Sequence, residues 1–203
     1  MAKNKIEFIE EDALAPLSAL VALDLHQNAM HGTLTSIPNS QKLDQILLSY
    51  NFLTSIDNLQ RSPHLTVLDL HNNKLDELPD SVLHLYHLKT LTISNNNLSD
   101  LNPKLSLLDS LMRLSLEGNP LRSIKPSMRN KGAVEIKKFL KMRLGDEEIL
   151  KEERQQAKAL GVPGASMMKE VDHWEVLLRE FVVGNHQLDL KNKELKFISP
   201  LLW

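Results

Sequence analysis

The chain has 203 residues, of which 42% are hydrophobic and 25% are charged, and its formal net charge at pH 7 is −2. This balance is typical of a chain with a sizeable buried core and excludes a fully disordered protein. The sequence contains no cysteine, which excludes stabilising disulfides and favours a reducing compartment. The N-terminus has no apolar signal-peptide core and no run of about 18 apolar residues occurs, so we expect a cytoplasmic protein that does not insert into a membrane.

One eleven-residue pattern recurs along the first part of the chain. Each copy has leucine or a similar apolar residue at its first, fourth, sixth and last positions, as in Leu65–Leu75. An asparagine occupies the ninth position and returns every 22 to 24 residues, at Asn4, Asn28, Asn51, Asn73, Asn96 and Asn119. This is the signature of leucine-rich repeats. It predicts an α/β fold, a leucine-rich repeat solenoid with a parallel β-sheet on the concave face and loops or single helical turns on the convex face.

Two stretches of the repeat region depart from the pattern. Residues 4–20 have the second half of a repeat whose strand is missing, so we expect a partial repeat followed by about five complete ones. Residues 31–38 are polar and have shifted leucine spacing, which predicts a local bulge. In each repeat the asparagine follows the strand, where its amide can hydrogen-bond main-chain groups of its own and the adjacent turn. We therefore expect the six asparagines to form a ladder.

A different periodicity begins after Ile124. Apolar residues then follow Gly132 at spacings of three and four, which is typical of an amphipathic helix. These residues are Ala133, Ile136, Phe139, Leu140 and Leu144. Because a solenoid needs its last open core edge covered, we expect this helix to be a C-terminal cap.

Beyond the cap, the sequence predicts a helical extension and a degenerate repeat. Residues 145–160 are charged and favour a helix, residues 161–166 interrupt it, and a second amphipathic helix is expected over 169–183. Residues 187–198 have the core of a repeat with lysine in place of the asparagine. The sequence thus predicts four segments: leucine-rich repeats over 1–121, a capping helix segment over 122–144, a charged helical extension over 145–186 and a partial degenerate repeat over 187–203.

The end of the repeat array carries a more specific likeness. The stretch Leu116–Ile124, followed by Lys131-Gly132 and the helical residues 136–140, resembles the intracellular leucine-rich repeat-containing protein 40 family. In that family such a segment closes a block of repeats, a polar insertion follows, and a further block resumes with an aberrant strand, and residues 122–198 have this order. Residues 4–14 also resemble that family's repeat just before this position. The resemblance implies a binding role without catalysis, in a partial or reduced array.

Strand alternation places one set of side chains on the concave face, the usual binding surface of a curved solenoid. We expect this face to bind a protein partner, while the alternative is that its side chains are simply solvated. The candidate partner-binding residues are Asp24, His26, Leu47, Tyr50, Asp69, His71, Thr92, Arg113 and Glu117.

Two other features could carry binding. The apolar stripe of the helix expected at 169–183, with Trp174, Leu178 and Phe181, either docks on the solenoid or recruits another chain. Between residues 122 and 144, eight lysines and arginines face a single acid, Glu135. Such a cluster can bind phosphates, but it can equally be the solvated side of a cap helix, neutralised by the acidic residues that follow. No aromatic residues interleave with these charges, so we do not expect nucleic acid as a partner.

The sequence offers little for chemistry. His26 and His71 lie two repeats apart, on the order of 10 Å, which is too far for one zinc ion. There is no cysteine nucleophile, no G-x-S-x-G, no H-E-x-x-H and no glycine-rich phosphate loop. We therefore expect no enzyme activity, metal or cofactor. Two hypotheses remain: a protein-protein interaction scaffold, or a structural subunit of a larger cytoskeletal or ciliary assembly.

Overall fold

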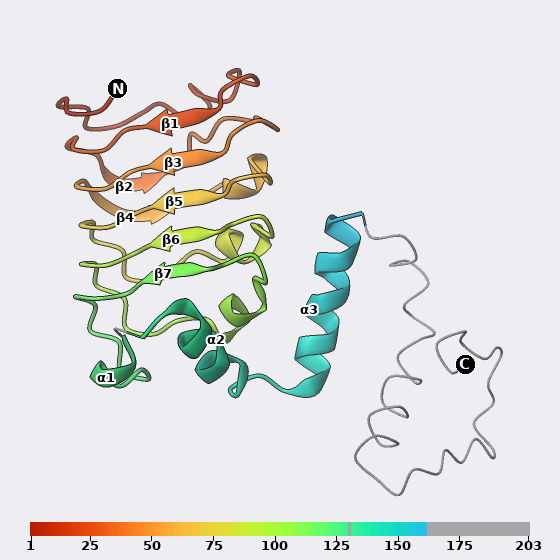
Figure 1. Ribbon diagram of the computed structural model, residues 1–203. Coiled ribbons are helices and arrows are strands. Elements are labelled where there is room, and N and C mark those ends of the chain that lie inside the picture. Colours follow the sequence, from red (N-terminus) through yellow and green to blue (C-terminus); the bar gives the residue numbers. More distant parts are fainter. Residues whose placement is uncertain (130, 162–203) are drawn as a thin grey trace, which may run out of the picture. The chain divides into compact units, whose positions relative to one another are not determined.

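The computed structural model describes residues 1–129 and 131–161 (Figure 1). The chain divides into two compact units, Met1–Gln156 and Ala157–Trp203, and the account below concerns the first. The helix expected at 169–183 and the degenerate repeat expected at 187–198 lie outside the described residues, so both stay predictions, as does the division into four segments.

Five short strands form one parallel sheet in the order β1, β3, β5, β6, β7. Their register aligns equivalent positions of successive repeats, so that Leu23 lies beside Ile46 and Ile46 beside Leu68. This confirms the predicted solenoid with a parallel sheet. The strands are Ala22–Asp24, Gln45–Leu47, Val67–Asp69, Thr90–Thr92 and Arg113–Ser115.

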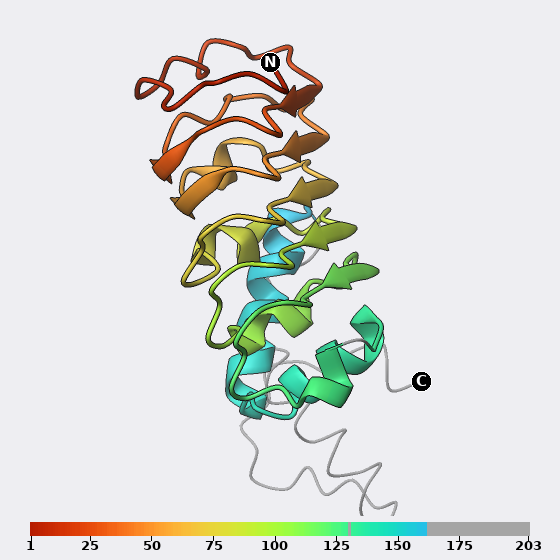
Figure 2. The same ribbon diagram turned by 90° about the vertical axis from the view of Figure 1, so that its left-hand side faces the viewer.

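A second sheet, which the sequence did not predict, consists of β2 (His31–Leu34) and β4 (Phe52–Ile56). Figure 2 shows this pair across the coil from the five-stranded sheet. Its parallel register shifts between Gly32 and Thr33, which confirms the bulge expected in residues 31–38. The pair is confined to two repeats, so it leaves no repeating signal in the sequence.

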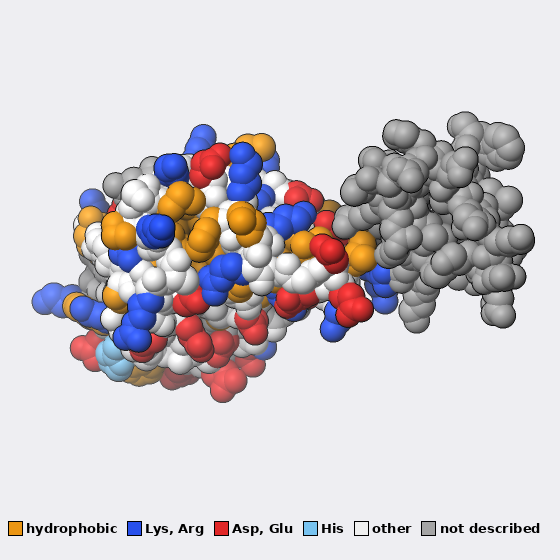
Figure 3. Space-filling view, turned by 90° about the horizontal axis from the view of Figure 1, so that it is seen from below, with side chains coloured by type: hydrophobic (Ala, Val, Ile, Leu, Met, Phe, Trp, Pro, Cys, Tyr) orange, Lys and Arg blue, Asp and Glu red, His pale blue; other side chains and the backbone are white. Residues whose placement is uncertain are grey.

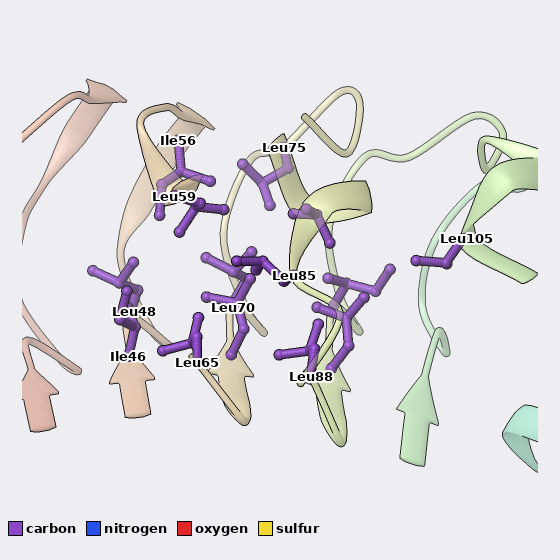
Figure 4. Close-up of a cluster of buried hydrophobic side chains, with 14 of the residues drawn as sticks. Ile46, Leu48, Ile56, Leu59, Leu65, Leu70, Leu75, Leu85, Leu88 and Leu105 are labelled. Carbon is purple, nitrogen blue, oxygen red and sulfur yellow. The ribbon is translucent and has the colours of Figure 1, made fainter. Parts of the chain in front are cut away.

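Short 3₁₀ helices lie on the return path of three repeats: the first follows β4 within its own repeat, and the other two lie in the next two repeats. They are η1 (Leu59–Arg61), η2 (Asp80–His84) and η3 (Pro103–Leu107). The leucines of strands and return segments meet in one continuous core between them (Figure 4). Leu70 and Leu85 are both fully buried there, and each such burial contributes about 1.5–3 kcal/mol.

Five of the six asparagines form the expected ladder. Asn51 is typical: its Nδ2 donates to the carbonyls of Leu48 in its own repeat and Leu25 in the previous one, both at 3.0 Å. Its Oδ1 accepts the N–H of Met30 at 3.1 Å. Asn28, Asn73, Asn96 and Asn119 are buried and bonded in the same way. The prediction was wrong for Asn4, which is exposed and donates only to Met1 and Ala2, because no strand precedes it.

The C-terminal end of the array is closed by helices. After α1 (Pro126–Arg129), helix α2 (Ala133–Lys141) buries Ala133, Ile136 and Leu140 against the core and packs on η3. This confirms the expected capping helix. The charged α3 (Asp146–Ala159) follows, and the side chains of Glu148 and Glu152 lie 3.9 and 2.6 Å from Lys104 Nζ on η3.

Within residues 1–129 and 131–161, no helix has both the length and the apolar character needed to cross a membrane.

Replacing Leu70 by alanine is expected to destabilise the solenoid, because its side chain is fully buried between strand and return segment. The free energy of unfolding in urea should fall by about 2–5 kcal/mol. Leu47→Ala is the matched control, since Leu47 lies on a strand but faces the concave surface half-buried, and it should cost less than about 1.5 kcal/mol. Equal losses would contradict the assignment of inward and outward positions.

Replacing Asn73 by aspartate tests the ladder with almost no change in shape. The new carboxylate keeps the acceptor for Leu53 N–H but removes the donor to the carbonyls of Leu48 and Leu70. Because a buried charge then faces two unpaired carbonyls, we expect a loss of at least about 3 kcal/mol in urea unfolding. Asn95→Asp, at an exposed turn position, should stay within about 0.5 kcal/mol; similar losses for both variants would show that the buried amide is not special.

Candidate functional site

The structure aligns four of the predicted residues in one row across the concave face. Asp24 lies beside Leu47, Leu47 beside Asp69, and Asp69 beside Thr92, each at the last position of its strand. We call Asp24, Leu47, Asp69 and Thr92 the central row. All four side chains are half-buried, so they are held in place by their neighbours while one side stays open to a partner.

Two aspartates of the central row each hold a histidine that follows two residues later. His26 Nδ1 lies 2.6 Å from Asp24 Oδ1, and His71 Nδ1 lies 2.7 Å from Asp69 Oδ1. In both pairs the main-chain N–H of the histidine also donates to the same carboxylate oxygen, at 3.2 Å. Burial alone would raise the pKa of Asp24, but the hydrogen bonds from His26 outweigh it and leave the pKa below its usual value. Each carboxylate therefore orients the imidazole ring of its histidine.

The remaining predicted residues lie around this row. Arg113 begins β7 and is exposed, and Glu117 is exposed just beyond the same strand. The main-chain bond from Asn95 N–H to the Glu117 carbonyl corresponds to the bond from Tyr50 N–H to the His71 carbonyl. Glu117 therefore occupies the position of His71 in the last repeat. The concave face is anionic at Asp24 and Asp69 and carries charges of both signs near β7.

Tyr50 is not on a strand but in the turn that follows β3. Its φ of +56° is in the left-handed region, which costs a bulky residue roughly 1–2 kcal/mol. The ring is half-exposed and meets the His71 ring edge to face, with centroids 4.7 Å apart. Tyr50 thus connects the concave face to the edge of the solenoid.

That edge contains a groove of about 880 Å³, which the sequence did not predict. We call it the turn groove. It follows the left-handed turn residues that precede the ladder asparagines, and exposed Phe52 and Lys74 lie beside them. Its lining residues are Tyr50, Asn51, Phe52, Thr54, Asn72, Asn73, Lys74, Asp76, Asn95, Asn96, Asn97 and Gly118. The sequence signal that could have indicated the groove is the type of residue before each ladder asparagine. Asn72, Asn95 and Gly118 are of types that adopt left-handed turns easily.

Two of the basic residues near the cap bond to main-chain carbonyls of the fold. Arg129 donates to the main-chain carbonyls of Ile124 and Asn119, at 3.0 and 2.9 Å, and closes the last turn of the array. Lys137 Nζ donates to the Leu108 carbonyl at 2.6 Å. Burial lowers the pKa of Lys137, as expected for an amine whose aliphatic stem lies along the core.

Acidic partners neutralise further cations at this end. Lys141 Nζ lies 3.6 Å from Glu153 on α3, and Arg143 contacts Asp100 at 2.9 Å. The hydrogen bond from Arg143 holds the pKa of Asp100 at about 2. Figure 3 shows the lysines and arginines of this end interspersed with acidic and apolar side chains. This arrangement favours the interpretation as the outer side of a cap, and the absence of a nucleic-acid partner stays a prediction.

The described residues contain neither a side-chain cluster suited to a metal ion nor the helix expected to recruit a partner. Among residues 1–129 and 131–161, no cluster of three or more histidine, aspartate or glutamate side chains could hold a metal ion. Trp174, Leu178 and Phe181 lie outside the described residues, so their role stays a prediction.

Comparison with known proteins agrees with the repeat pattern. A family model described as leucine rich repeat matches residues 63–127, and one described as leucine rich repeats in two copies matches residues 41–83. A comparison with curated protein sequences finds no match.

A solved structure shares the architecture at low sequence identity. A leucine-rich repeat protein from Bacteroides eggerthii is 21% identical, with a TM-score of 0.54, over 62% of this chain and 23% of that one. An internalin, InlF, from Listeria monocytogenes is 17% identical, with a TM-score of 0.42, over 63% of this chain and 44% of that one. The chain therefore spans less than half the length of either. The fold of the repeat region is that of a leucine-rich repeat solenoid closed by a capping helix, an architecture whose curved surface generally serves to bind other proteins.

Proposed function

We propose that the concave face binds a protein partner and that the chain acts as a non-catalytic interaction scaffold. The observation that carries the proposal is the central row, in which Asp24, Leu47, Asp69 and Thr92 lie side by side on hydrogen-bonded strands. Because the strands and the two Asp–His pairs are already fixed, binding would order few additional groups, which favours affinity.

The chemistry of the row favours one kind of partner surface. Leu47 supplies an apolar contact between the carboxylates of Asp24 and Asp69, one on the strand to each side. A lysine or arginine of the partner can place its aliphatic stem on Leu47 and its charge beside either carboxylate. We therefore expect the partner to present a basic side chain at the centre of the interface.

We also propose a cytoplasmic location and a relationship to the leucine-rich repeat-containing protein 40 family. The lack of cysteine supports the location. The relationship rests on the closing segment Leu116–Ile124, whose Arg122 and Ser123 precede the cap. Expression of a tagged full-length chain in cells, followed by fractionation, tests the location, and recovery in a secreted fraction would contradict it.

The alternative function is a structural subunit of a larger cytoskeletal or ciliary assembly. It is favoured by apolar side chains at the N-terminal end of the array, where Phe8 is 70% exposed, Val21 56% and Leu17 40%. A neighbouring subunit could cover these side chains. A monodisperse monomer in light scattering, with amides of residues 4–21 strongly protected from hydrogen exchange, would contradict this alternative.

A Leu47→Arg variant tests the scaffold directly. The added guanidinium places a cation where the proposed partner presents its own, so capture of partner proteins from cell extract by the immobilised full-length chain should fall at least tenfold. The measurement is quantitative mass spectrometry of the captured proteins. Val134→Arg is the matched control, since Val134 is 63% exposed and lies on the capping helix α2, outside the central row. Capture that is unchanged in Leu47→Arg, or lost equally in both variants, would overturn the concave-face proposal.

A further inference from the structure

We propose that the turn groove is a second binding site and that its ligand is a proline-rich segment in the polyproline II conformation. The groove lies at the edge of the solenoid and does not include the central row, so the proposal does not rest on the function assigned to the concave face. Four properties of the groove carry it: an occupied main chain, two half-exposed aromatic rings, two unpaired amides and a matching repeat distance.

The main chain of the groove cannot accept an added β-strand at its turns. The N–H groups of Tyr50, Asn72 and Asn95 already donate to the carbonyls of the next repeat, at 3.0, 3.0 and 2.7 Å. Pairing with a strand would require free main-chain donors and acceptors in a row. Recognition must therefore come from side chains, which excludes strand addition along this row and favours a ligand that needs no main-chain ladder.

Aromatic rings form one end of the groove. Tyr50 is 50% exposed and Phe52 is 55% exposed. One residue separates them in the sequence, and Phe52 is the first residue of β4. The contact with His71 restrains the Tyr50 ring. Rigid aromatic surfaces of this kind bind proline rings, which are apolar and already restricted in conformation.

Amide groups line the middle of the groove. Among the described residues, the side-chain amides of Asn72 and Asn95 make no hydrogen bond to another group. Each can donate to a ligand carbonyl through its NH₂ group. A polyproline II helix has no internal hydrogen bonds, so all its carbonyls are available as acceptors.

The spacing of the turn residues suits this helix. Successive repeats are about 4.8 Å apart along the sheet, so Tyr50 and Asn95, two repeats apart, are separated by about 9.6 Å. A polyproline II helix repeats every three residues, or about 9.3 Å. Every third residue of the ligand would therefore meet every second turn position. The four turn positions from Tyr50 to Gly118 accommodate about five to six ligand residues.

The charge of the groove selects against other ligands. Among its lining residues, Lys74 is the basic one and Asp76 the acidic one, so the groove is neutral overall. A polyanion such as RNA would find one cation beside one anion, although bases could stack on the rings. An amphipathic helix would need a continuous apolar stripe, whereas the apolar surface here is confined to Tyr50 and Phe52 at one end. A neutral, proline-rich segment is the complementary ligand.

Gly118 keeps the far end of the groove in shape. Its φ is +74°, and a Cβ at this position would lie 2.0 Å from Oδ1 of Asn95. Glycine therefore allows the Asn95 side chain to lie over the turn of the next repeat. A larger residue at this position would displace one of the two amides that the ligand would contact.

Titration of the ¹⁵N-labelled full-length chain with a heptaproline peptide tests the proposal by NMR. We expect saturable shifts of the Asn72 and Asn95 side-chain NH₂ signals and of the main-chain signals of Tyr50 and Phe52. Tyr50→Asn should weaken binding at least tenfold without unfolding the turn, because asparagine occupies the equivalent left-handed position in the next two repeats. Asn72→Ala combined with Asn95→Ala should weaken it by a similar factor.

The controls separate this site from the concave face. Leu47→Arg should leave heptaproline binding within twofold of the unaltered chain, even where it removes capture of a partner protein. A flexible heptapeptide of alternating glycine and serine should produce less than a tenth of the shift at equal concentration. The proposal is overturned if heptaproline produces no saturable shift, if the shifts map to the central row, or if Tyr50→Asn binds as well as the unaltered chain.

Discussion

The solenoid depends on the satisfaction of main-chain carbonyls where each strand bends into its turn. These carbonyls lie in the buried interior, where an unpaired polar group costs about 1–3 kcal/mol. Each buried asparagine donates to carbonyls of two successive repeats and accepts an N–H from the return segment, as Asn96 does with Leu70, Ile93 and Leu75. The ladder thus fixes the stacking distance, and the leucine core can pack only at that distance.

The binding surfaces follow from the same constraint. With the repeats held in register, the last residue of every strand comes to one line, which creates the central row. The residue before each ladder asparagine is forced into a left-handed turn at a regular interval, which creates the turn groove. Neither surface needs additional elements to support it, because the ladder that holds the core also positions both.

The sequence predicted the repeated positions, the local bulge and the capping helix, and it missed features that depend on how particular residues come together in space. Every rung contributes a leucine or isoleucine at the position of Leu68 and an asparagine at that of Asn73, so strand positions, inward faces and the ladder could be read from periodicity. The β2–β4 pair is confined to two repeats, and the turn groove depends on how Tyr50, Phe52 and Asn95 come together in space. Asn4 has the right spacing, but no strand precedes it. The alignment of the central row could also be read from strand alternation, because its residues occupy the same position in successive repeats.

The shared hydrogen bonds of the ladder also bear on how such a chain can change in length. A segment from one ladder asparagine to the next, such as residues 74–96, brings its own strand, its own asparagine and one set of bonds to the repeat before it. Removing or duplicating exactly one such unit leaves every remaining asparagine opposite an equivalent carbonyl, and the spacing of 22 or 23 residues between the five buried asparagines shows that the return segments absorb a change of one residue. The array can therefore lengthen or shorten in whole repeats, and each step adds or removes one position of the central row and one turn of the groove while the ladder stays continuous.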